Sequence, residues 1–144
     1  MQQSVEIVGR VVVLVKIGKV EDISTAFATL SDERAGALMV LTDPFFFSQR
    51  QRIAEAAIRG RLPTIFPQRE YAEAGGLMSY GESFADVYRR AAFYVDKIMK
   101  GAKPADLPVQ QPTRFVLTIN RKTAEALGIM IPLELLVVSD EIIE

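Results

Sequence analysis

The chain has 144 residues, a length that fits one domain and leaves little room for a second. Hydrophobic residues make up 49% and charged residues 24%, as in folded globular proteins, and the formal net charge is -1. This balance argues against a nucleic-acid-binding protein, which presents a basic surface to phosphates. The densest set of basic residues consists of Arg50, Arg52, Arg59 and Arg61. Glu55 interrupts this set, and such a mixture of charges is typical of a solvated helix face.

Histidine and cysteine are both absent from the sequence. Their absence excludes a thiolate nucleophile, an imidazole base and a Cys/His metal site. Any catalysis would have to use Asp, Glu, Lys, Ser or Tyr, so we expect no metal and no cofactor. Without cysteine, the sequence also leaves the redox compartment open.

Apolar runs long enough to cross a membrane are missing. The longest runs, Val11–Val15 and Ala37–Leu41, are far shorter than the ~20 residues that a membrane-spanning helix needs. The first residues, Met1–Glu6, lack the basic-then-apolar order of a secretory signal. We therefore expect a chain that does not span a membrane and that is cytoplasmic if it is expressed as written.

Short apolar runs alternate with helical patterns, which predicts an α/β fold with a mainly parallel sheet and flanking helices. Val11–Val15 is β-branched and apolar on both faces, as expected of a strand covered by helices. A helix with acidic residues in its first turn follows, and its apolar face consists of Ile23, Ala26, Phe27 and Leu30.

The next unit begins with Ala37–Leu41, predicted as a second buried strand that ends before Pro44, which lacks an N–H donor. Ser48 is the predicted N-cap of the following helix, and Gln51 completes a capping box. That helix ends at Gly60. Its predicted buried stripe consists of Ile53, Ala54, Ala57 and Ile58.

Two short units precede the clearest helix of the chain. Leu62–Phe66 and Leu77–Tyr80 are predicted strands, and Arg69–Ala74 is a predicted helical turn between them. Ser83 is the predicted cap of the long helix, which ends at Gly101. Its apolar face consists of Phe84, Val87, Tyr88, Ala91, Val95, Ile98 and Met99.

The remaining residues predict a connector, a strand and a short helix. Residues 102–113 contain three prolines and are typical of an extended surface segment. Phe115–Ile119 is a predicted strand, and Asn120 is the predicted cap of a helix that ends at Gly128. The tail 129–144 is apolar and must pack on something.

Ligands of open α/β sheets bind beyond the carboxyl ends of the strands. That rule selects three segments: Thr42–Phe47, Pro67–Glu70 and Ser79–Gly81. The aromatic run Phe45–Phe47 either lines a cleft or plugs the start of a helix. Asp43 either accepts hydrogen bonds from a ligand or caps the turn at Pro44.

The other candidates also have two interpretations. Arg69 either grips a ligand carboxylate with its planar fork or pairs with Glu70 on the surface. Ser79 and Tyr80 offer hydroxyl groups that orient a bound molecule, although Tyr80 also fits a core position.

Catalysis has little support in the sequence. Ser79 and Ser83 have no histidine partner, and the G-x-S-x-G elbow is absent. Gly75-Gly76 does not begin a phosphate loop, and G-x-G-x-x-G is absent, which argues against nucleotide binding. The separations of Asp43, Glu70 and Glu73 cannot be read from the sequence. We predict that the protein is not an enzyme.

Ordered motifs from about Val20 onward resemble the substrate-binding proteins of ABC-type uptake transporters, of the tryptophan/tyrosine type. They are Leu62–Phe66, Glu73–Gly81 (EAGGLMSYG), Tyr94–Pro108 (YVDKIMKGAKPADLP), Gln111–Phe115 and Ile119–Gly128 (INRKTAEALG). The resemblance implies one lobe of a type I periplasmic binding protein, Rossmann-like in fold. Such a receptor closes on a small molecule between two lobes and delivers it to a membrane permease.

The resemblance also assigns positions. It implies that one wall of the cleft contains Asp43, Phe46, Arg69, Ser79 and Tyr80, and that the ligand is an amino acid or an aromatic carboxylate. It divides the chain into a ligand-binding lobe, residues 1–109, and a strand–helix segment, residues 110–144, that returns toward the other lobe in full-length relatives. It places such proteins in the periplasm.

The resemblance implies a signal peptide and an N-terminal lobe in full-length relatives, and we expect neither in this chain. We therefore predict a homodimer or larger assembly, with exchanged C-terminal segments as one possible form. The alternative function is a truncated lobe that acts only as an oligomeric interaction protein. A small α/β enzyme is the third possibility.

Overall fold

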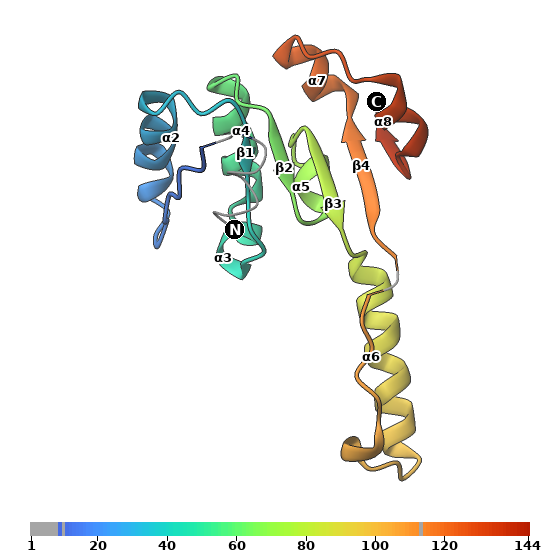
Figure 1. Ribbon diagram of the computed structural model, residues 1–144. Coiled ribbons are helices and arrows are strands. Elements are labelled where there is room, and N and C mark those ends of the chain that lie inside the picture. Colours follow the sequence, from blue (N-terminus) through green and yellow to red (C-terminus); the bar gives the residue numbers. More distant parts are fainter. Residues whose placement is uncertain (1–8, 10, 113) are drawn as a thin grey trace.

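A five-stranded sheet forms the centre of the computed structural model, which describes Gly9, residues 11–112 and residues 114–144 (Figure 1). Met1–Glu6, where a signal was sought, and Thr113 of the connector lie outside the described residues. The strands follow the order β1 (Leu38–Met39), β2 (Thr64–Phe66), β3 (Met78–Gly81), β4 (Val116–Asn120) and β5 (Glu141–Ile143). Among the described strands only the β3–β4 pair is antiparallel, so the predicted mainly parallel α/β fold is confirmed.

Helices connect the strands and bury one face of the sheet. They are α2 (Asp22–Asp32), α3 (Pro44–Ser48), α4 (Arg50–Arg59), α5 (Arg69–Glu73), α6 (Phe84–Met99), α7 (Arg121–Leu127) and α8 (Leu133–Val138), with a 3-10 turn at Pro104–Asp106. The core cluster joins α2, α4 and α5 to the strands and consists of Ile23, Val40, Ile53, Phe66 and Tyr71. The helical periodicities predicted for α2 and α4 are therefore confirmed.

One row of side chains crosses the sheet beneath α5. Phe66, Ser79 and Thr118 are register partners on adjacent strands, so their side chains share a face, and all three are buried. Tyr80 follows Ser79 on β3 and therefore points to the opposite face, where its side chain is 55% exposed. The two faces of the sheet thus differ, one being covered by helices and the other partly open.

Helix α6 projects away from the sheet as an arm, and the connector after it runs back along its side (Figure 1). The Tyr94 hydroxyl donates a hydrogen bond to the carbonyl oxygen of Pro108 at 2.5 Å, which ties the connector to the helix. The apolar face predicted for this helix is not covered by the rest of the described chain. No residue of α6 is buried, and Tyr88 and Met99 are 72% and 82% exposed.

The strand predicted at Val11–Val15 is also absent, because residues 11–18 form no regular element. A strand is stable only when a neighbour satisfies its backbone N–H and C=O groups. In the described residues β1 pairs with β2 alone, so no ladder includes this segment. Val13, Val15 and Ile17 still alternate as half-buried side chains, and Ile17 packs against the core.

The strand predicted at Ala37–Leu41 is shortened to Leu38–Met39 and is not covered on both faces. Val40 is buried, whereas Met39 is 62% exposed and Leu41 is also exposed. The cause is the same missing neighbour: β1 is an edge strand of the described sheet. Apolar composition alone therefore overstated the burial of this segment.

Asp43, not Ser48, caps the helical region that follows β1. The Asp43 carboxylate accepts hydrogen bonds from the backbone nitrogens of Phe45 at 2.7 Å and Phe46 at 3.4 Å, with Pro44 at the first helical position. Ser48 ends α3, and its hydroxyl donates to the carbonyl oxygen of Phe45. The capping box predicted for Ser48 and Gln51 is wrong, because the chain becomes helical one turn earlier.

The segment Phe115–Gly128 lies on the sheet of its own chain. Strand β4 pairs with β3, and the Asn120 side chain caps α7 by accepting a hydrogen bond from the Thr123 nitrogen at 3.0 Å. Gly128 ends α7 with φ 70°, as predicted. The arm α6, rather than this segment, is what leaves the sheet. The division of the chain at residue 110 stays a prediction.

Candidate functional site

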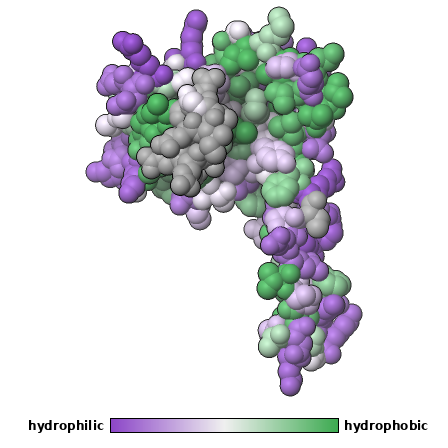
Figure 2. Space-filling model, in the orientation of Figure 1, coloured by the Kyte–Doolittle hydropathy of each residue, from purple (hydrophilic) through white to green (hydrophobic). Residues whose placement is uncertain are grey.

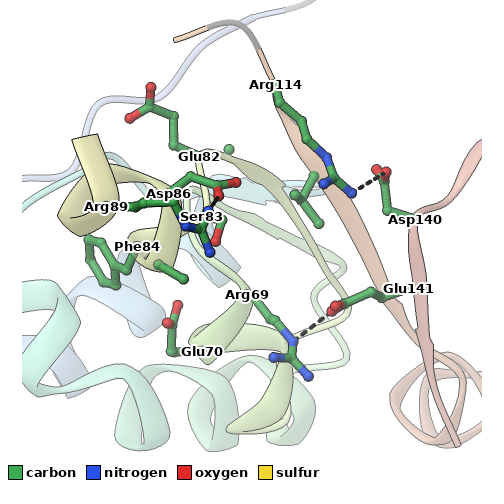
Figure 3. A pocket seen from close by; sticks show the side chains of 13 residues that line it. Arg69, Glu70, Glu82, Ser83, Phe84, Asp86, Arg89, Arg114, Asp140 and Glu141 are labelled. Atoms are coloured by element: carbon green, nitrogen blue, oxygen red, sulfur yellow. Dashed lines mark hydrogen bonds and ion pairs between the residues drawn. The ribbon is translucent and has the colours of Figure 1, made fainter. Parts of the chain in front are cut away.

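The candidate site lies at the edge where β1, β2 and β3 end and where β4 and β5 begin. A cavity of about 340 Å³ opens there, beside the start of α6 (Figure 3). Its charged lining consists of Arg69, Glu70, Glu82, Asp86, Arg89, Arg114, Asp140 and Glu141. This is the edge at which the strand-end rule places ligands.

Two ion pairs connect β5 to the rest of this edge (Figure 3). Arg69 Nε lies 2.6 Å from a carboxylate oxygen of Glu141, and the same guanidinium also pairs with Glu73 at 3.2 Å. Arg114 lies 3.7 Å from Asp140. These side chains are partly exposed, so each pair contributes little stability and a ligand carboxylate can replace one partner at small cost.

The two acidic partners, Asp140 and Glu141, also contact strand β4. The Asp140 carboxylate accepts a hydrogen bond from the Leu117 nitrogen at 2.9 Å, and the Asp140 nitrogen donates to the Leu117 carbonyl oxygen at 2.9 Å. The Thr118 hydroxyl lies 3.5 Å from Glu141. Asp140 and Glu141 thus each contact β4 in addition to their arginine partner.

Asp43 lies after β1 and is exposed. Its two hydrogen bonds to the start of α3 supply the capping role that the sequence offered as one alternative. Contact of Asp43 with a ligand stays a prediction.

The aromatic run Phe45–Phe47 belongs to α3, and all three side chains are half-buried. Phe46 and Phe47 pack against the core cluster, so this run largely fills the base of α3. The Phe47 ring makes edge-on contacts with Tyr71 and with Phe84, the first residue of α6. Contact of Phe46 with a ligand stays a prediction.

Ser79 and Tyr80 lie on opposite faces of β3. Ser79 is fully buried, and its hydroxyl has no hydrogen-bond partner among the described residues. Tyr80 stacks on Phe115 with ring centroids 5.5 Å apart. The five predicted site residues therefore do not form one cluster, and Arg69 alone among them lines the cavity.

Three further residues that line the cavity were not predicted from the sequence, namely Arg114, Asp140 and Glu141. They lie at the start of β4 and β5, and the strand-end rule considers only the strands that end at this edge. Recognising that β4 is antiparallel to β3 would have placed its first residues here.

Tyr71 lies behind the site, fully buried and stacked on Phe66 with ring centroids 4.7 Å apart. Burial raises its pKa from 10.0 to about 12; the negative charge of Asp43 adds to this effect, and Arg50 opposes it. The hydroxyl is therefore neutral at ordinary pH. It has no hydrogen-bond partner among the described residues.

Within the described part of the chain, no group of three or more acidic residues is placed to hold a metal ion. In the same residues, none of the helices combines the length and the apolar character that crossing a membrane requires.

Comparison with known families identifies the fold and the family. Residues 1–143 match the model of the ABC transporter substrate binding protein family. The chain belongs to this family. Comparison with curated proteins gives no match.

Three solved structures have the same fold. A conserved domain protein from Vibrio cholerae O1 biovar El Tor has a TM-score of 0.89 and 27% identity, over 97% of this chain and 47% of its own. The ABC domain of Streptococcus pneumoniae in complex with L-Trp has a TM-score of 0.86 and 25% identity, over 99% and 49%. The ligand-free, open structure of CD0873, a substrate-binding protein with adhesive properties from Clostridium difficile, has a TM-score of 0.69 and 20% identity, over 99% and 47%.

This family member therefore spans about half the length of the solved proteins that it matches. The resemblance seen in the sequence motifs is confirmed, as is the fold of one lobe of a periplasmic binding protein. The family is one of substrate-binding proteins.

Proposed function

We propose that this chain forms one wall of the ligand cleft of an ABC uptake receptor. It binds a small molecule, such as an amino acid or an aromatic carboxylate, without catalysing a reaction. The observation that carries this proposal is the cavity at the strand-end edge, where partly exposed arginines face the start of α6. The permease of an ABC transporter is the expected partner, and the periplasm the expected location.

The charges of the cavity support a ligand that carries both an acidic and a basic group. Arg69 and Arg114 supply planar guanidinium groups that suit a carboxylate. Glu70 lines the same cavity and makes no ion pair within the described residues, so it suits an ammonium group. The S. pneumoniae relative was solved with L-Trp, a molecule with both groups.

Two features support a site with a second wall. The cavity is open to solvent, whereas a bound ligand is normally enclosed over most of its surface. The arm α6 leaves the lobe at the cavity and exposes an apolar face, as expected of a helix whose packing partner lies elsewhere. We therefore expect the chain alone to bind weakly.

Isothermal titration with L-tryptophan and L-tyrosine tests this proposal. We expect binding, and we expect Arg114→Gln to weaken it by about tenfold or more, because a charge-assisted hydrogen bond is lost. Arg59→Gln is the matched control, since Arg59 is exposed at the end of α4 and does not line the cavity. Equal binding by both variants would contradict the proposed role of Arg114.

A second candidate function is an oligomeric interaction protein. The observation that favours it is the exposed apolar face of α6, which includes Tyr88, Val95 and Met99; hydrophobic residues are visible at the surface of the arm (Figure 2). Light scattering after size exclusion tests it. A dimer that Val95→Glu converts to a monomer supports assembly through the arm, and a monomer at high concentration contradicts it.

A further inference from the structure

Phe47 connects the body of the lobe to the base of the arm. Its ring lies edge-on to Tyr71, with centroids 5.8 Å apart and an interplanar angle of 76°. On its other side it lies edge-on to Phe84, the first residue of α6, at 5.4 Å and 79°. Three consecutive aromatic contacts therefore lead from the core to the arm, namely Phe66–Tyr71, Tyr71–Phe47 and Phe47–Phe84, and Phe47 takes part in the last two.

A cation holds Phe47 in place. The Arg50 guanidinium carbon lies 4.8 Å from the centre of the Phe47 ring, and Arg50 Nη1 donates a hydrogen bond to the Phe47 carbonyl oxygen at 3.1 Å. The Arg50 side chain thus contacts both the ring and the backbone of Phe47. These two contacts fix the position of the Phe47 ring, on which Phe84 packs.

The arm has few other constraints on its direction. No other helix or strand lies along α6 in the described residues, and the connector that accompanies it belongs to the arm itself. The ion pair nearest its base joins Arg90 of α6 to Glu82, which directly follows β3 and precedes the helix. Before the helix, Gly81 packs so closely on Pro67 that an added Cβ would lie 1.8 Å from the Pro67 carbonyl oxygen. The chain is therefore held at Gly81, and its direction is set in the next few residues.

We propose that Phe47 is a positioning residue whose contact with Phe84 fixes the angle between the α6 arm and the sheet. This inference rests on the proposed function for its purpose, because Phe84, the residue of the arm that Phe47 contacts, lines the candidate cavity. A ligand that displaces Phe84 from Phe47 then changes the direction of the arm. The contact between Phe47 and Phe84 thereby couples the cavity to the direction of α6.

The length of the arm makes such coupling measurable. A helix of 16 residues is about 24 Å long, since each residue adds about 1.5 Å. A rotation of about 10° at Phe84 therefore moves the far end of α6 by about 4 Å.

Pulsed electron paramagnetic resonance on a doubly labelled chain tests the proposal without ligand. The sequence has no cysteine, so Glu33→Cys at the end of α2 and Lys103→Cys beyond the arm accept the only two spin labels. We expect one narrow distance distribution. We expect Phe47→Leu to broaden it and to shift its mean by several ångströms, while Phe45→Leu, whose ring contacts Phe46 but not the arm, leaves it unchanged.

Phe84→Leu removes the same contact from the arm side and leaves the core residues intact, so it decides the matter if Phe47→Leu does not fold. It should reproduce the broadening without changing the melting temperature of the lobe, and the double variant should be no broader than either single variant. An unchanged distribution in Phe84→Leu, or broadening in Phe47→Leu alone, overturns the proposal. Failure to bind amino acids would contradict the proposed function and leave this result standing.

Discussion

The side-chain amide of Asn120 donates a hydrogen bond to the carbonyl oxygen of Ala72, 48 residues earlier in the chain, at 2.8 Å. The same side chain caps α7 through Thr123, so one buried residue joins β4, α5 and α7. The C-terminal segment is thereby attached to the sheet behind the candidate site.

Removing this side chain tests the attachment. We expect Asn120→Ala to lower the free energy of unfolding by about 2–3 kcal/mol, because a buried carbonyl loses its donor and a helix loses its cap. Urea denaturation measures the change, with Gln110→Ala on the exposed connector as the control. A loss below about 0.5 kcal/mol, the level of ordinary surface substitutions, would show that the segment does not depend on Asn120.

Gly76 provides a test of packing beneath α5. A Cβ at this position would lie 2.5 Å from Phe66 Cε2 and 2.9 Å from the Tyr71 carbonyl oxygen. We expect Gly76→Ala to destabilise the fold by about 1–3 kcal/mol through overpacking. Gly36→Ala is the matched control, because nothing lies within 4 Å of its added Cβ. Equal melting temperatures for the two variants would contradict the packing described for Phe66 and Tyr71.

Tyr71 predicts how stability depends on alkaline pH. Its pKa is raised from 10.0 to about 12 in the folded state, so the unfolded chain releases this proton first as the pH rises. The contribution of this pKa shift to the free energy of unfolding is complete below about pH 10 and is lost between about pH 10 and pH 12. We expect Tyr71→Phe to reduce the slope of the unfolding free energy against pH in that window.

Below pH 9, Tyr71→Phe should be neutral or stabilising by up to about 1 kcal/mol, because it removes a buried hydroxyl that has no partner among the described residues. Chemical denaturation at a series of pH values measures both effects. A clear loss of stability at neutral pH would show that the hydroxyl makes a hydrogen bond.

Because the apolar face of α6 is exposed, a charged substitution on that face should hardly change the stability of the fold. Val95 belongs to the apolar face predicted for this helix, and its side chain is exposed. We expect Val95→Glu to change the free energy of unfolding by less than about 0.5 kcal/mol, whereas Ile53→Glu in the core of α4 should prevent folding. Circular dichroism and urea denaturation of the two variants measure this contrast. Severe destabilisation by Val95→Glu would mean that the arm packs on the lobe.

Local sequence patterns correctly predicted features that depend on residues close in the sequence. The periodicity of α4, the cap at Asn120 and the stop at Gly128 depend on near neighbours in the sequence, and all three were correct. Val11–Val15 and the apolar face of α6 have the composition of buried elements but no partner in the described structure. Composition states what a segment prefers and does not state whether a neighbour is present.

The candidate site was less predictable for a related reason. Arg69 was found because it follows a parallel strand, whereas Arg114 and Glu141 come to the same edge only because β4 reverses direction beside β3. Strand direction is a property of the whole sheet. Ser79 was chosen for its place at a strand end, and the alternation of β3 turned it beneath α5.

The proposed ligands of the strand-end edge are small molecules that carry a carboxylate and an ammonium group. Nuclear magnetic resonance of the ¹⁵N-labelled chain, titrated with the standard amino acids and with aromatic carboxylates, tests this proposal most directly. We predict saturable shifts confined to amides around Gly81–Ala85, Arg114–Val116 and Asp140–Glu141, and their loss in Arg114→Gln. If no compound causes shifts, or if the shifts are scattered over the sheet and the arm alike, the proposed binding at this edge is contradicted.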